Sequence, residues 1–215
     1  MKVPCPAHMR RICIYGAGMI FLAIGLTLNI KAGLGTAPVL TVPLTISEIW
    51  GLPFSSAVFA VYIVFVVGQI ALQGKWTWKT VLQVPFSVAF SLLLRQFEGL
   101  LAVNPSGLGG RLLVLAISVA VTAAGIGMMV NTRLISNPAD GLAATLGEKI
   151  NRGAGTGKNI LDLSCVAISC ATGLLTGGTV YGVGAGTLIS MLMVGRVLAL
   201  FNRCFQEKIK RLSGL

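Results

Sequence analysis

Residues 112–130 read LLVLAISVAVTAAGIGMMV, an apolar run that contains no charged side chain. About 20 residues of this kind, coiled into a helix, span the roughly 30 Å hydrocarbon core of a lipid bilayer. Five further stretches are also long and predominantly apolar, and none shows the two-residue alternation of a membrane β-strand. The sequence therefore predicts an all-α, polytopic membrane protein with six transmembrane helices, at 12–30, 54–72, 80–101, 112–130, 159–175 and 181–201.

The composition of the 215-residue chain supports the same class. Hydrophobic residues make up 55% of it and charged residues 11%, whereas a soluble domain carries about 25% charged residues. So few ionic groups could not cover a water-exposed surface. This excludes an ordinary soluble enzyme, a disordered chain and a small disulfide scaffold.

The basic residues indicate how the spans are oriented. There are 17 Lys and Arg against 6 Asp and Glu, a net charge of +11. With the N-terminus inside, the inner segments hold thirteen of these bases, beginning with Lys2, and the outer segments hold only Lys31 and Arg111, with Arg95 near an outer helix end. Because cytoplasmic loops carry such an excess, we expect both termini in the cytoplasm, the lipid bilayer as a partner, and no nucleic-acid binding.

The chain repeats itself at an offset of about 100 residues. Gly25 corresponds to Gly125, Pro38 to Pro138 and Glu48 to Glu148, and the same order of elements follows in each half. Farther on, an insertion shifts the offset, so that 79–80 corresponds to 186–187. Three spans per repeat make the second copy enter the membrane in the opposite direction. We expect a first repeat at 1–103, an outer linker at 104–111, a second, inverted three-helix repeat at 112–203, and a basic cytoplasmic tail at 204–215.

Two segments, 36–50 and 137–152, are too short to span a bilayer. Pro38 and Pro138 suit a first helical turn, and Asn137 can cap the second of these helices. A re-entrant half-helix would aim its free N–H groups into the bundle, whereas an interfacial helix would only brace it. The sequence leaves both alternatives open.

Ionisable side chains at membrane depth are the candidates for a binding site, because a buried charge is costly there. Asp162 lies near the start of the fifth span, and Asp140 follows the second proline turn beside Arg133. Each acid also has a structural explanation: Lys158 could neutralise Asp162 one helical turn away, and a helix dipole favours an acid such as Asp140 in its first turn. The candidate substrate-binding residues are Asn29, Pro38, Arg133, Asn137, Pro138, Asp140 and Asp162.

The groups that catalysis usually needs are missing from the sequence. The single histidine, His8, lies in the predicted cytoplasmic N-terminal segment, and neither a metal-ligand motif such as HExxH nor a paired catalytic carboxylate occurs. The Ser and Cys residues of the spans have no histidine to activate them. We therefore expect no enzymatic activity, no metal site and no cofactor.

Three motifs of the second half form a recognisable set. They are Asn-Pro-Ala-Asp-Gly-Leu at 137–142, Gly-Lys at 157–158 followed by Asp162, and Gly-Ala-Gly-Thr-Leu-Ile-Ser at 184–190 followed by Gly195. This set resembles the bacterial YczE/YyaS/YitT-type integral membrane proteins, over nearly the whole chain and most clearly after residue 120. The first half departs from the pattern, since 36–39 lacks the acid and 79–80 replaces the glycine-rich turn. The resemblance implies a multi-pass protein of the bacterial inner (plasma) membrane and says little about activity.

The inverted repeat, the paired proline turns and the acid in the fifth span favour a small-molecule transporter or exporter. Its site would lie at the repeat interface, and the sequence does not identify its substrate. Two alternatives stay open. One is a non-transporting scaffold or accessory subunit, as a homodimer or with another membrane protein, and the other is the substrate-capture subunit of a multi-component transporter.

Overall fold

The computed structural model describes residues 7–215, and all regular structure in this range is helical. The elements are α1 (Ala7–Lys31), α2 (Pro38–Trp50), α3 (Phe54–Gln73), α4 (Trp78–Val81), α5 (Gln83–Leu100), α6 (Gly107–Thr132), α7 (Pro138–Lys149), α8 (Gly153–Thr172), a π-helical turn (Gly173–Gly177) and α9 (Ala185–Ser213). Within the described residues, six stretches are long and apolar enough to cross a membrane: α1, α3, α4 with α5, α6, α8 with its π-helical turn, and α9. The predicted all-α class with six spans is confirmed.

Several boundaries differ from the predicted ones, among them the starts of α1 at Ala7 and of α8 at Gly153, which were predicted at 12 and 159. Residues 107–110 of the predicted linker form the first turn of α6, because the apolar run behind them continues the helix. The predicted tail 204–215 mostly continues α9 as far as Ser213, with an ion pair of 3.6 Å between Lys210 Nζ and Glu207 Oε1 on its surface. Helix α9 begins at Ala185 rather than at 181, because Gly182 has a φ of +68° and the chain before α9 is not helical. Lys2, the first base of the predicted inner side, lies outside the described residues.

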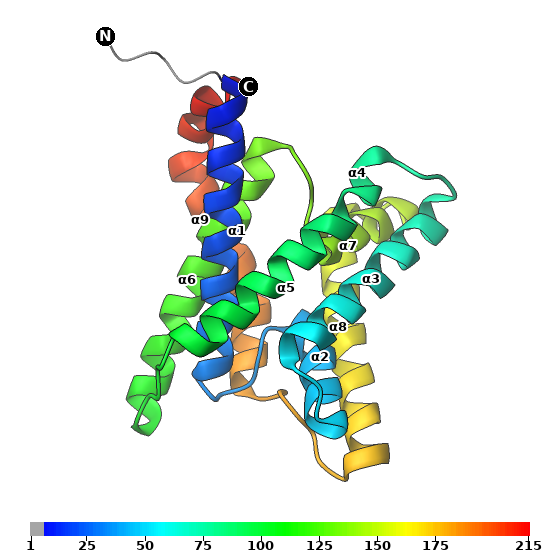
Figure 1. Ribbon diagram of the computed structural model, residues 1–215, viewed down its shortest axis with the longest axis vertical. Coiled ribbons are helices and arrows are strands. Elements are labelled where there is room, and N and C mark those ends of the chain that lie inside the picture. Colours follow the sequence, from blue (N-terminus) through cyan, green and yellow to red (C-terminus); the bar gives the residue numbers. More distant parts are fainter. Residues whose placement is uncertain (1–6) are drawn as a thin grey trace.

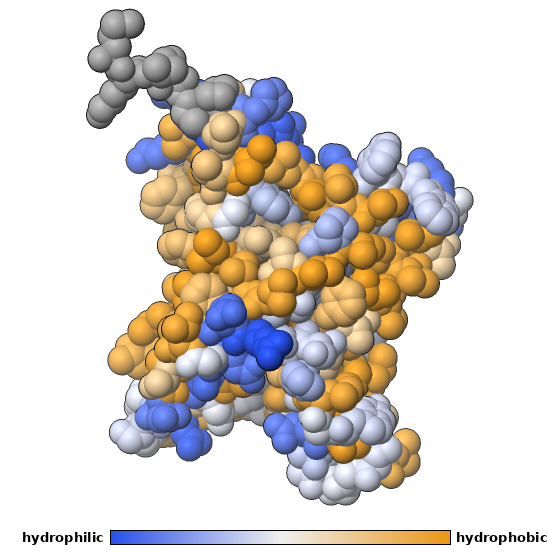
Figure 2. All heavy atoms as spheres, viewed as in Figure 1, coloured by the Kyte–Doolittle hydropathy of each residue, from blue (hydrophilic) through white to orange (hydrophobic). Residues whose placement is uncertain are grey.

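The outer surface of the bundle is apolar around its middle. Each span exposes large hydrophobic side chains, among them Phe21, Val64, Leu92, Leu113, Leu163 and Leu192. Figure 2 shows apolar residues across much of the middle of this face and hydrophilic residues toward its two ends, with one further hydrophilic group just below the middle. Exposed Trp50, Trp76 and Trp78 lie at helix ends, where amphipathic rings prefer the membrane interface. This surface is that of a multi-pass membrane protein.

The two repeats meet where α1 crosses α6. The helices run in opposite directions (Figure 1), as an inverted repeat requires. A Cβ atom at Gly25 would lie 2.9 Å from Thr122 Cα, and a Cβ atom at Gly125 would lie 2.9 Å from Leu22 Cα. These two contacts are equivalent under the offset of 100 residues, so α1 and α6 pack backbone against backbone at two symmetry-related points.

The short helices α2 and α7 join the two halves. Helix α2 packs against α3 of its own repeat and α8 of the other, and α7 packs against α8 of its own repeat and α3 of the other. Each helix begins in the interior, at Pro38 or Pro138, and ends at the exposed Trp50 or Lys149. Both therefore present their N-termini to the inside of the bundle, as half-helices do, rather than only bracing its surface.

The two ends of the described chain are neighbours. A Cβ atom at Gly214 would lie 2.9 Å from Ala7 Cβ, so the start of α1 and the end of α9 share one end of the molecule. The turn between α6 and α7 lies toward the same end in Figure 1. We refer to it as the terminal end.

We predict that replacing Gly25 with Ala destabilises the protein, because the added methyl group meets the backbone of Thr122. Overpacking of this kind costs about 1–3 kcal/mol. Gly16→Ala is the matched control on the same helix, since a Cβ atom at Gly16 has nothing within 4 Å. Thermal unfolding of both variants in detergent is the measurement, and equal melting temperatures would contradict the proposed backbone contact.

Candidate functional site

A central cavity lies where the repeats meet. Its walls include two pairs of residues that the offset relates, Leu22 with Thr122 and Leu26 with Ile126, on α1 and α6. Both short helices reach it with their N-terminal residues, 37–40 at the start of α2 and Asn137, Ala139 and Asp140 at the start of α7. Helices α3, α8 and α9 complete the lining with Tyr62, Lys158, Asp162, Ser190, Met191 and Val194.

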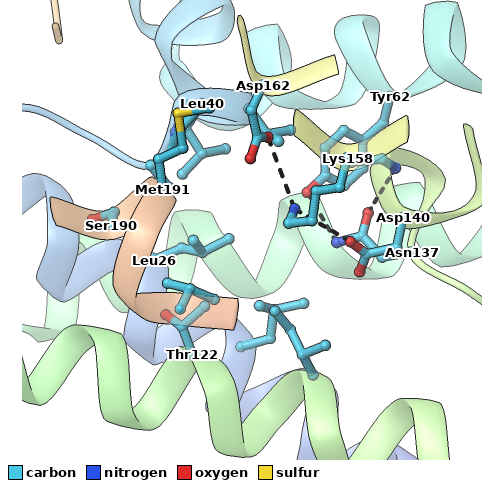
Figure 3. A pocket seen from close by; sticks show the side chains of 17 residues that line it. Leu26, Leu40, Tyr62, Thr122, Asn137, Asp140, Lys158, Asp162, Ser190 and Met191 are labelled. Atoms are coloured by element: carbon cyan, nitrogen blue, oxygen red, sulfur yellow. Dashed lines mark hydrogen bonds and ion pairs between the residues drawn. The ribbon is translucent and has the colours of Figure 1, made fainter. Parts of the chain in front are cut away.

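Three ionisable residues on the second repeat form an acid–lysine cluster at this cavity. Lys158 Nζ lies 3.6 Å from Asp140 Oδ1 and 3.8 Å from Asp162 Oδ1 (dashed lines in Figure 3). The sequence predicted the pairing of Lys158 with Asp162, and the structure adds Asp140 as a second partner of the same ammonium group. The side chain of Asp162 is only 4% exposed, and its Oδ1 has no hydrogen-bond partner.

Asn137 fixes the start of α7 beside this cluster. Its Oδ1 accepts a hydrogen bond of 3.1 Å from the Ala139 backbone N–H, which confirms the predicted cap. Its Nδ2 donates to the hydroxyl of Tyr62 at 3.3 Å. Tyr62 in turn stacks on Phe90 at 5.8 Å between ring centroids. Asn137 therefore couples the helix N-terminus of one repeat to the aromatic core of the other.

Two side-chain hydrogen bonds from Asn29 lie at the wall of the central cavity opposite the acid–lysine cluster. Asn29 Nδ2 donates to Ser190 Oγ at 2.9 Å and to Ser118 Oγ at 3.1 Å. Asn29 itself lies behind the wall, and Ser190 is the member that lines the cavity. The Oδ1 atom of Asn29 is buried without a hydrogen-bond partner.

A larger space adjoins the central cavity, and we call it the vestibule. The two share Leu22, Ile126, Asn137, Asp140 and Lys158 as lining. The vestibule is also lined by Lys79, by 133–136 between α6 and α7, and by 154–155 at the start of α8. These segments belong to the terminal end, so the cavity communicates with that end of the molecule.

The corresponding turn of the first repeat is closed by backbone hydrogen bonds. Thr36 N donates to Gly182 O at 2.7 Å, and Gly186 N donates to Leu34 O at 2.7 Å. Gly35 has a φ of +108°, and a Cβ atom there would lie 2.7 Å from Gly184 N. Thr36 is 3% exposed, whereas its counterpart Ser136 is exposed. Two turns related by the repeat thus adopt different states, one closed and one open.

The structure brings four of the seven predicted site residues into one lining: Pro38, Asn137, Asp140 and Asp162. Arg133 lines the vestibule, and Asp140 pairs with Lys158 instead of with Arg133. Pro138 is buried in the first turn of α7. Asn29 does not line the cavity but donates a hydrogen bond to Ser190, which does. Tyr62 and Ser190 were missed as site residues, although the offset of 100 relates Tyr62 to Asp162 and so offered a signal.

Fold and site together define a multi-pass helical membrane protein with a polar cluster in a cavity between two inverted repeats. The model described as "Family of unknown function (DUF6198)" matches residues 9–203, so the chain belongs to this family. No curated protein and no solved structure matches the chain.

We predict that Lys158→Met destabilises the protein, because it leaves two carboxylates facing each other without the ammonium group between them. An unsatisfied buried partner costs about 1–3 kcal/mol. The neutral triple variant, Lys158→Met with Asp140→Asn and Asp162→Asn, should recover most of the melting temperature. A triple variant that is less stable than the single one would show that the cluster does not act as an electrostatic unit.

Proposed function

We propose that this protein moves a small molecule across the membrane, with the substrate held in the central cavity. The observation that carries the proposal is the cavity itself: the N-termini of two short, inverted helices and the middles of α1 and α6 line one space at the repeat interface. Secondary transporters built from inverted repeats place their substrate sites in this position, at discontinuous helices.

The unequal turns supply a mechanism of alternating access. In the present state, the turn at 34–36 is held by backbone hydrogen bonds to residues at and just before the start of α9. Its counterpart in the second repeat, the turn at 134–136, lines the vestibule. Exchange of the two conformations between the repeats would close the terminal end and open the opposite one. The substrate would then meet the other side of the membrane without leaving the acid–lysine cluster.

For orientation we propose that the terminal end faces the cytoplasm of a bacterial cell. The distribution of basic residues supports it, since Arg133 and Lys79 in the vestibule and Lys208, Lys210 and Arg211 near the end of α9 all lie toward that end. The kinship with YczE/YyaS/YitT-type proteins of the inner membrane stays a prediction from sequence motifs.

Reconstituted vesicles test transport directly. Proteoliposomes are loaded with a bacterial metabolite extract, and their contents are followed by mass spectrometry against protein-free vesicles. We expect selective loss of at least one solute, and a reduction of about tenfold or more in the Asp140→Asn and Asp162→Asn variants. Glu148→Gln, an exposed acid outside the site, should transport like the wild type.

Two outcomes would contradict the proposal. Vesicle contents that match protein-free controls would favour a scaffold, an accessory subunit or a capture subunit. Selective flux that is unchanged in both aspartate variants would refute the site while leaving transport in place.

Thiol labelling of intact cells tests the orientation. In a chain whose native cysteines are replaced by serine, Ser106→Cys lies in the exposed connection before α6, and Glu207→Cys lies on the exposed face near the end of α9. A membrane-impermeant maleimide should label position 106 in intact cells and position 207 only after lysis. The reverse pattern would place the terminal end outside.

A further inference from the structure

The two repeats contribute opposite chemistry to the same cavity. The offset of 100 relates Asp140 to Leu40, Lys158 to Val58 and Asp162 to Tyr62. Leu40 and Tyr62 line the cavity, and Val58 is fully buried behind them. A pseudo-symmetric site thus has one charged half, the acid–lysine cluster, and one apolar half at the equivalent positions of the first repeat.

The charged half has one more carboxylate than it has bases. With Asp140, Lys158 and Asp162 ionised, the cluster carries one net negative charge. The other bases nearby, Lys79 and Arg133, line the vestibule and not the central cavity. The N-termini of α7 and α2 each add a partial positive charge of about half a unit; Asp140 complements that of α7, whereas α2 has no acid in its first turn, and half a unit does not cancel a full negative charge. The excess at the cavity is therefore negative.

One carboxylate oxygen is free to accept a ligand. Asp162 Oδ1 is buried and has no hydrogen-bond donor, since Lys158 Nζ at 3.8 Å lies beyond hydrogen-bond range. In Figure 3 its carboxylate points to the space between Lys158 and Met191. A buried acceptor left without a donor is costly, and a cationic N–H group in that space would satisfy it.

The rest of the cavity is a hydrocarbon and aromatic wall. It comprises Leu22, Leu26, Leu40, Ile126, Met191 and Val194, with Tyr62 beside the cluster. Such a wall does not solvate a small inorganic cation, but it favours the apolar body of an organic one.

We propose that the central cavity binds an amphiphilic organic monocation, with a primary ammonium group at Asp162 and an apolar or aromatic body against Leu40, Met191 and Val194. This inference rests on the proposed function and specifies the class of its substrate.

Equilibrium binding to the full chain in lipid nanodiscs, measured by isothermal titration calorimetry, tests the substrate class. Three probes of similar shape differ in charge: 2-phenylethylammonium, neutral 2-phenylethanol and anionic 3-phenylpropanoate. We expect the cation to bind at least about tenfold more tightly than the other two, a difference of about 1.4 kcal/mol. Methylammonium, which lacks the apolar body, should also bind at least about tenfold more weakly than 2-phenylethylammonium.

Two variants locate the bound cation. Asp162→Asn should weaken binding of 2-phenylethylammonium about tenfold or more, and Glu148→Gln should leave it unchanged. Thermal unfolding of Asp162→Asn in the same nanodiscs establishes that it is folded, and the comparison among the probes on the wild-type chain does not depend on it.

Tighter binding of 3-phenylpropanoate, equal binding of the charged and neutral probes, or no binding of 2-phenylethylammonium would overturn the inference. Failure of the inference is distinguishable from failure of the proposed function. Solute flux in proteoliposomes without cation binding would refute only the substrate class, whereas cation binding without any flux would refute only transport.

Discussion

The close crossing of α1 and α6 is the contact on which the rest of the structure depends. Gly25 and Gly125 let the two backbones approach at equivalent points, and this places the symmetry axis of the repeats between them. In a bilayer, helices gain little from hydrophobic burial against each other, so close packing of small residues has to hold them together. Because the axis passes through this crossing, the short helices α2 and α7 are directed from opposite ends toward the same central space.

That shared space explains why a charged cluster can exist in an otherwise apolar bundle. Asp140 and Asp162 are tolerated because Lys158 lies between them, and because α7 presents its N-terminus beside Asp140. The first repeat has no charged residue at the equivalent positions. They are occupied by Leu40, Val58 and Tyr62 instead. The two halves thus share their order of elements but not their chemistry, and this difference gives the cavity a polar side and an apolar side.

Much of the architecture could be predicted from the sequence, because membrane insertion leaves strong signals in it. Long, predominantly apolar runs located all six spans, and the recurring prolines located both short helices. The ends were harder to predict: Gly107 suggested a flexible linker, yet the helix behind it extends through that residue, and the basic segment after 203 remains helical because its residues favour helix formation.

The site was predictable only in part. Asp162 and Lys158 are one helical turn apart, so their pairing follows from the sequence, and Asn137 before Pro138 predicts a cap. The contact between Asp140 and Lys158 depends on how α7 packs against α8, and the contribution of Tyr62 depends on how α3 packs across the repeat boundary. Such contacts between distant segments have no local signal, and even the internal offset identifies positions rather than the atoms that meet.

Alternating access requires the two proline turns to exchange their conformations together. Pulsed electron spin resonance distances test it most directly, with spin labels at Lys31→Cys and Thr179→Cys near the closed turn, and at Trp76→Cys and Ser136→Cys near the open one. Gly35→Ala should break the close approach to Gly184, so we predict that it lengthens the first distance and shortens the second in the same fraction of molecules. A change confined to the first pair, with the second pair unaffected, would contradict coupled exchange.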